Sequence, residues 1–101
     1  MDLKPRYTGV EDTTFDIAQD FLDSIVVLGA DIAIQLKKVL EKNEDIFKKE
    51  GSMTYGFKIE ELFYEIEIYC EDGFAPLLED IRKINVDDYL DHINNNTKLN
   101  D

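Results

Sequence analysis

The chain has 101 residues, of which 44% are hydrophobic, and a formal net charge of −12 at pH 7. This size and apolar content fit one hydrophobic core, so we expect residues 1–101 to form a single acidic domain. Its longest apolar run has four residues, far below the roughly 18 of a membrane span, and neither a signal peptide nor a disulfide is expected, which predicts a cytoplasmic location.

The first predicted helix begins after an extended segment. Residues 1–10 contain a proline, a glycine and little periodicity, and we expect them to be flexible. Thr13 followed by Asp16 resembles a capping box, which predicts a helix start, and Gly29 is placed to end the helix. Its apolar residues recur at helical spacing: Phe15, Ala18, Phe21, Leu22 and Ile25.

A second helix is predicted over residues 31–49. Its apolar side chains share one face, and five lysines lie off that face, which is typical of an amphipathic helix. Asn43 interrupts the apolar face and indicates a bend or a polar contact. The apolar face consists of Ile32, Leu36, Val39, Leu40 and Phe47.

Residues 58–72 are compatible with a helix or a strand. Five glutamates in this segment, its length and Gly73 as a stop favour a helix. Its tyrosine and isoleucine content favours a strand, in which case residues 53–70 form a hairpin. We take the helix as the prediction and the hairpin as the alternative.

Two further helices are predicted towards the C-terminus. Pro76 suits the first turn of one of them. Asn85 with Asp88 predicts the start of the last, and residues 95–101 are expected to be a flexible tail. The apolar residues that these helices bear are Leu77, Leu78, Ile81 and Ile84 in the first, and Val86, Tyr89, Leu90 and Ile93 in the second. The predicted fold is therefore mainly α, a single-domain bundle of about four to five helices, with an α+β fold containing the hairpin as the alternative.

The sequence offers few groups for chemistry. A structural zinc site needs about four Cys or His ligands, and only Cys70 and His92 are present. We interpret Cys70 as a packing residue and His92 as an exposed residue near a helix end. Neither a calcium loop nor a glycine-rich phosphate loop is present. We therefore expect no metal, no cofactor and no enzyme activity.

The negative charge is concentrated in two segments. Residues 11–31 hold six acids and no base, and residues 59–91 hold eleven acids against two bases. On the helical reading, Tyr64 and Ile68 leave the core face and lie among glutamates, as an apolar anchor with a charged rim. On the strand reading they join the core. The predicted partner-binding residues are Tyr64, Ile68, Glu60, Glu61, Glu67, Glu71, Asp72, Asp16, Asp20 and Asp23.

This charge pattern favours an interaction protein. An acidic surface repels nucleic acid and membranes and speeds association with basic proteins. The leading hypothesis is a non-catalytic inhibitor of a basic partner, most plausibly a bacterial immunity protein or antitoxin that neutralises a nuclease-type toxin. In size, acidity and lack of catalytic groups the chain resembles small bacterial immunity proteins, a likeness that assigns no residue.

Two other functions remain open. One is a phage-type nucleic-acid mimic that inhibits a DNA-binding defence protein, with Asp16, Asp20 and Asp23 standing in for phosphates. The other is a helical adaptor or regulatory module.

Overall fold

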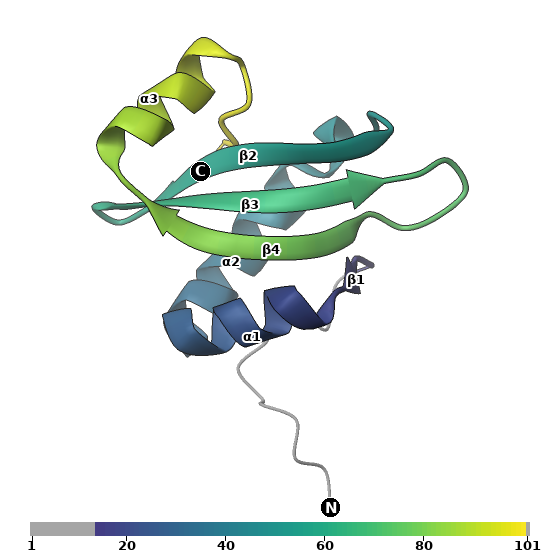
Figure 1. Ribbon diagram of the computed structural model, residues 1–101, viewed down its shortest axis with the longest axis horizontal. Coiled ribbons are helices and arrows are strands. Elements are labelled where there is room, and N and C mark those ends of the chain that lie inside the picture. Colours follow the sequence, from purple (N-terminus) through teal and green to yellow (C-terminus); the bar gives the residue numbers. More distant parts are fainter. Residues whose placement is uncertain (1–13, 101) are drawn as a thin grey trace, which may run out of the picture.

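A mixed four-stranded sheet organises the chain in the computed structural model, which describes residues 14–100 (Figure 1). The sheet order is β1-β4-β3-β2, in which β2, β3 and β4 are antiparallel and β1 runs parallel to β4. The predicted mainly α bundle is therefore wrong, and the fold is α+β. The elements are β1 (Asp16–Ile17), α1 (Gln19–Leu28), α2 (Ala30–Lys42), the 3-10 turn η2 (Glu44–Ile46), β2 (Gly51–Ile59), β3 (Leu62–Cys70), β4 (Leu77–Ile84) and α3 (Val86–Asn94).

The segment predicted as a helix over residues 58–72 is mostly strand β3, paired with β2 in a hairpin. Its side chains alternate strictly between the buried core and the opposite face of the sheet, which is the period of a strand. Ile59 pairs with Leu62, so only Glu60 and Glu61 form the turn, and Glu60 has a φ of 57°. The side chains of β3 that face the core are Tyr64, Ile66, Ile68 and Cys70.

The helix predicted from Pro76 is strand β4, which contains a β-bulge. Asp80 pairs with Glu67, but the next pair is Leu78 with Ile68, so Glu79 is an extra residue in β4. A bulge changes the alternation of the strand, and here it turns both Leu78 and Ile81 into the core. Their spacing of three residues imitates the period of a helix, which explains the wrong prediction.

The helices α1 and α2 cover one face of the sheet, with α2 behind it in Figure 1. Gly29 ends α1 with a φ of 107°, as predicted, and α2 begins at the next residue. Thr13 lies outside the described residues, and α1 begins at Gln19 rather than near it, because Asp16 pairs with Leu77 in β1. The fully buried apolar residues of the two helices are Phe21, Ile25, Ala33, Leu36 and Leu40.

Helix α3 lies on the opposite face of the sheet. Its start is capped as predicted, since the Asp88 amide donates to Asn85 Oδ1 at 2.9 Å. The ring of Tyr89 lies 4.5 Å from the ring of Phe63, which belongs to the outer face of β3. Of the four apolar residues that the sequence assigned to this helix, only Tyr89 is buried.

The chain then returns along the outer edge of β2. The Gly56 amide donates to the Thr97 carbonyl at 2.9 Å, and the Leu99 amide donates to the Gly56 carbonyl at 2.7 Å. Leu99 is fully buried in the core. The Asn43 side chain donates to the Asn100 carbonyl and accepts from its amide, so it makes the polar contact that its position predicted. Residues 97–100 thus form a packed segment where a flexible tail was expected.

Candidate binding surface

The predicted apolar anchor is not on the surface. Tyr64 and Ile68 are 2% and 0% exposed, respectively, and both belong to the core. The reason is the strand period of β3, which brings these two side chains and Ile66 onto the same buried face. The patch built on Tyr64 and Ile68 is therefore wrong.

The predicted acidic residues are spread over four regions. Glu60 and Glu61 form the turn at one end of the hairpin. Glu71 and Asp72 follow β3 at the other end, where Asp16 joins them because β1 pairs with the start of β4. Asp20 and Asp23 are exposed on α1. Glu67 lies on the outer face of β3.

An exposed aromatic residue stands beside Glu71 and Asp72. Within residues 14–100, Phe74 is the most exposed aromatic side chain, at 71%. It lies in the loop between β3 and β4, and aromatic side chains are enriched at protein–protein interfaces. The sequence carried a signal for it, because an aromatic residue directly after Asp72 and Gly73 falls in a turn rather than in a strand.

An acidic groove lies between α3 and the outer face of β2 and β3. Its volume is about 530 Å³, and its lining includes three carboxylates and neither lysine nor arginine. Glu79 reaches its margin, since Ser52 Oγ donates to Glu79 Oε1 at 2.6 Å. The residues that line the acidic groove are Ser52, Met53, Thr54, Glu65, Asp88, Asp91, His92, Asn95 and Thr97.

His92 closes one side of the acidic groove and is only 8% exposed, so the prediction of an exposed histidine is wrong. Its Nε2 lies 2.7 Å from Glu65 Oε1, and its Nδ1 lies 2.6 Å from Thr97 Oγ1. Because a carboxylate only accepts hydrogen bonds, Nε2 carries a proton and donates to Glu65. A Cβ atom at Gly56 would stand 2.8 Å from two ring carbons of His92, so the ring packs on the backbone of β2.

This arrangement gives His92 a structural role. A hydroxyl, an imidazole and a carboxylate in a row resemble the groups of a nucleophilic triad. Here, however, the His92 ring is buried and packs on the backbone of β2 at Gly56. The contacts attach α3 and the residues after it to the sheet.

Arg82 offsets part of the negative charge on the outer face of the sheet, the face on which α3 lies. Its guanidinium lies 3.4 Å from Glu65 and 3.9 Å from Glu67, and the side chains of these glutamates are 20% and 34% exposed. Partial burial strengthens the interaction of such carboxylates with a cation. One arginine cannot neutralise the five carboxylates of this region, namely Glu65, Glu67, Glu79, Asp88 and Asp91.

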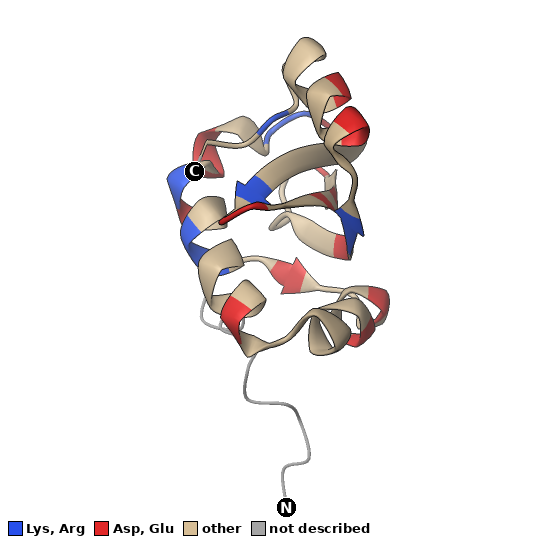
Figure 2. Cartoon of the chain, turned by 90° about the vertical axis from the view of Figure 1, so that its left-hand side faces the viewer, with Lys and Arg blue, Asp and Glu red and all other residues tan. Residues whose placement is uncertain are grey.

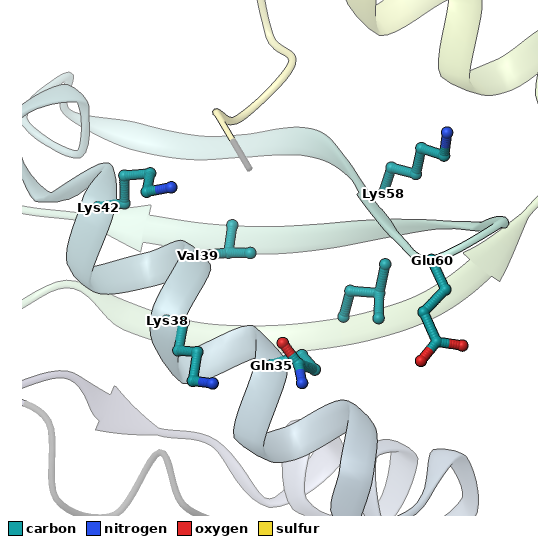
Figure 3. Close-up of a pocket in the computed structure, with 7 residues that line it drawn as sticks. Gln35, Lys38, Val39, Lys42, Lys58 and Glu60 are labelled. Atoms are coloured by element: carbon teal, nitrogen blue, oxygen red, sulfur yellow. The ribbon is translucent and has the colours of Figure 1, made fainter.

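The lysines gather elsewhere. In Figure 2 the Lys and Arg residues coloured blue concentrate along α2 and the neighbouring strands. Helix α3 contains three aspartates and neither lysine nor arginine. Lys38, Lys42 and Lys58 line a groove of about 430 Å³ between α2 and β2. In Figure 3 Lys38 and Lys58 point away from each other, so the three ammonium groups do not converge on one anion.

Cys70 is buried, as expected of a packing residue. Its Sγ donates to the Phe47 carbonyl at 3.2 Å, and burial raises the pKa of the thiol. A thiol with a raised pKa is a weak nucleophile near neutral pH. In the part of the chain that the structure describes, no three His, Cys, Asp or Glu side chains are placed to hold a metal ion. Nor is any described helix both long and apolar enough to span a membrane.

Neither a protein-family model, nor a curated protein, nor a solved structure matches this chain.

Proposed function

We propose that the protein is a non-catalytic inhibitor of a basic protein, acting in the cytoplasm as an immunity protein or antitoxin against a nuclease-type toxin. The observation that supports this proposal best is the acidic groove, where Glu65, Asp88 and Asp91 come together from β3 and α3. Nuclease clefts bind phosphates and are rich in lysine and arginine. A cationic surface of that kind complements the groove in charge.

The groove is suited to both fast and selective association. Its carboxylates steer a cationic partner during diffusion, which raises the association rate at low salt. Glu65 is already in contact with His92 and Arg82, so the exposed Asp88 and Asp91 present the charge of the groove to an incoming cation.

Phe74 supports slow dissociation. Interfaces owe most of their affinity to a few buried aromatic or arginine side chains surrounded by polar residues. Phe74 is 71% exposed and has Glu71 and Asp72 close by in the loop, so it replaces the anchor that the sequence assigned to Tyr64 and Ile68.

The geometry favours an inhibitor of this kind over a nucleic-acid mimic. A mimic needs carboxylates repeated along one face like phosphates. Asp20 and Asp23 lie on α1, but Asp16 lies on β1, so the three residues do not form one helical row.

The proposal is tested by capture and titration. The protein is immobilised and incubated with a lysate of its source organism, and the captured protein is then produced separately. We expect a basic protein whose nuclease activity falls to background at one equivalent of inhibitor. A partner that stays active in molar excess of this protein would contradict the proposal, as would turnover of a substrate by this protein alone.

Charge reversal locates the contact. The double variant Asp88→Lys with Asp91→Lys is compared with Asp20→Lys with Asp23→Lys, which places the same charges at the same spacing on α1. We expect the α3 variant to slow association by about tenfold or more at low salt, and the α1 variant to have a much smaller effect. Equal effects would show that only net charge matters, and the groove would lose its role.

A further inference from the structure

Strand β2 lies at the edge of the sheet, and part of that edge is open. The segment after α3 covers it at Gly56, whose amide and carbonyl both bond to residues 97–99 (Figure 1). In an antiparallel ladder, alternate residues of a strand turn both of their backbone groups to the same side. Because β2 pairs with β3 without a bulge, Ser52 and Thr54 turn their amides and carbonyls to the same edge as Gly56.

No segment within residues 14–100 covers these two residues. The amides and carbonyls of Ser52 and Thr54 make no hydrogen bond in that part of the chain. Ser52 is exposed and Thr54 is half-buried. The segment after α3 does not continue along the strand to Thr54, because the Thr97 amide donates to the His92 carbonyl at 2.9 Å. We call the stretch from Ser52 to Thr54 the open β2 edge.

The charges beside the open β2 edge select the kind of segment that fits. Ser52 and Thr54 line the acidic groove together with Asp88 and Asp91, and both aspartates are exposed. Neither lysine nor arginine lines this groove. Along the edge, Lys98 lies opposite Gly56, so it is not opposite Ser52 or Thr54. A strand added here would turn every second side chain over the acidic groove, where a cationic side chain is favoured.

We propose that the open β2 edge binds an extended cationic segment of the partner as an added antiparallel strand. This inference rests on the proposed function and adds to it the chemical class of the segment that is recognised. The backbone of the segment would exchange hydrogen bonds with Ser52 and Thr54, and its alternate side chains would supply the selectivity. Residues directly opposite each other in an antiparallel pair share one face of the sheet. Lysines opposite Ser52 and Thr54 would therefore lie over the acidic groove.

The charges also argue against a second copy at this edge. Two copies that paired through their β2 strands would bring two acidic grooves together, and like charges at an interface cost free energy. A cationic strand would instead place its positive side chains beside Asp88 and Asp91.

The test uses a labelled synthetic peptide of about eight residues, the length of an ordinary strand, in which lysine and threonine alternate. Fluorescence anisotropy measures its affinity at low salt for the full chain and for two variants of Thr54. Thr54→Pro removes the edge amide and puts the proline ring in its place, which edge strands tolerate. Thr54→Val is the matched control, because it keeps the amide and removes only the hydroxyl. We expect Thr54→Pro to weaken binding by about tenfold or more and Thr54→Val to change it by less than about twofold.

Two methylated peptides test the backbone contact without changing the protein. In the antiparallel pair the lysine amides of the peptide face β2 and the threonine amides face away. We expect methylation of the lysine amides to weaken binding by about tenfold or more, and methylation of the threonine amides to weaken it by less than about threefold. Equal binding of the two methylated peptides would overturn the inference, because it would show attraction by charge alone. A dimer of the free protein that Thr54→Pro dissociates would also overturn it, since a second copy would then occupy the edge.

Thermal unfolding of each variant checks that it is folded. If Thr54→Pro does not fold, the two methylated peptides decide the question with the unaltered protein. If folded Thr54→Pro keeps full affinity for the captured partner while Asp88→Lys with Asp91→Lys loses it, this inference fails and the proposed function stands. If neither variant affects the captured partner, both fail.

Discussion

Replacing Leu99 by alanine is expected to destabilise the protein severely, although the residue lies only two positions before the last one. Leu99 is fully buried in the core, and removing a buried leucine side chain costs about 2–5 kcal/mol, because its transfer free energy is lost and a cavity remains. For a domain of this size each kcal/mol lowers Tm by about 4–8 °C. We therefore expect Leu99→Ala to lower Tm by about 10–30 °C.

The assay is thermal and urea unfolding followed by circular dichroism. Leu90→Ala is the matched control, since Leu90 is 47% exposed, and it is expected to cost less than about 1 kcal/mol. If Leu99→Ala lowers Tm no more than Leu90→Ala does, residues 97–100 are not docked and the reasoning is refuted.

Three further predictions follow from backbone geometry and burial. In Gly56→Ala the new Cβ would stand 2.8 Å from the His92 ring, so we expect a loss of about 1–3 kcal/mol and faster amide exchange in α3; unchanged exchange would contradict this packing. Glu60 has a left-handed backbone conformation, with a φ of 57°, so Glu60→Gly should raise the free energy of unfolding by about 1 kcal/mol. Glu61 has no positive φ, so Glu61→Gly should give no such gain. A lower Tm for Glu60→Gly would count against strain in the turn. Burial raises the pKa of the Cys70 thiol above its ordinary 9.0, so the folded state holds this proton more tightly than the unfolded state. This stabilisation is complete below about pH 8 and is lost as pH rises through 9 and above, which the urea midpoint measured at rising pH would reveal; a midpoint that stays constant above pH 9 would argue against it.

The presence of α1, α2 and α3 could be predicted from local signals, but their details could not. The helix predicted over residues 31–49 ends at Lys42, and only Tyr89 of the apolar residues assigned to α3 is buried. Gly29 separates two amphipathic segments, and the structure ends α1 and begins α2 on either side of it. Asn85 has both the residue type and the position of a helix cap, and its side chain does cap α3. These signals act over four residues or fewer, so they do not depend on the rest of the chain.

The leading prediction placed helices where β3 and β4 lie, and a hairpin over residues 53–70 was only the alternative, for two physical reasons. The β2–β3 turn consists of Glu60 and Glu61, neither of which is the glycine or asparagine that marks a two-residue hairpin turn. The bulge at Glu79 places Leu78 and Ile81 on one face, which imitates helical spacing. Pairing between strands compensates for the unfavourable turn residues and for the bulge. Paired residues are not neighbours in the sequence, so a local pattern does not reveal their pairing.

The candidate surface was only partly predictable. The excess of acids is a property of composition, and most of the described acids are exposed. The acidic groove was not foreseeable, because it needs Glu65 of β3 to meet Asp88 and Asp91 of α3 across the outer face of the sheet. Phe74 was accessible to sequence reasoning, since its place after Asp72 and Gly73 marks it as a loop residue.

The burial of Leu99 also bears on how the protein is made. Translation proceeds from the N-terminus at about 5–20 residues per second, so all four strands leave the ribosome before residues 97–100 do. During that interval the edge of β2 at Gly56 has no covering segment, and the nascent core lacks its last side chain. A chain that lacks residues 97–100 would have an open strand edge at Gly56, the kind of product that aggregates or is cleared by proteases.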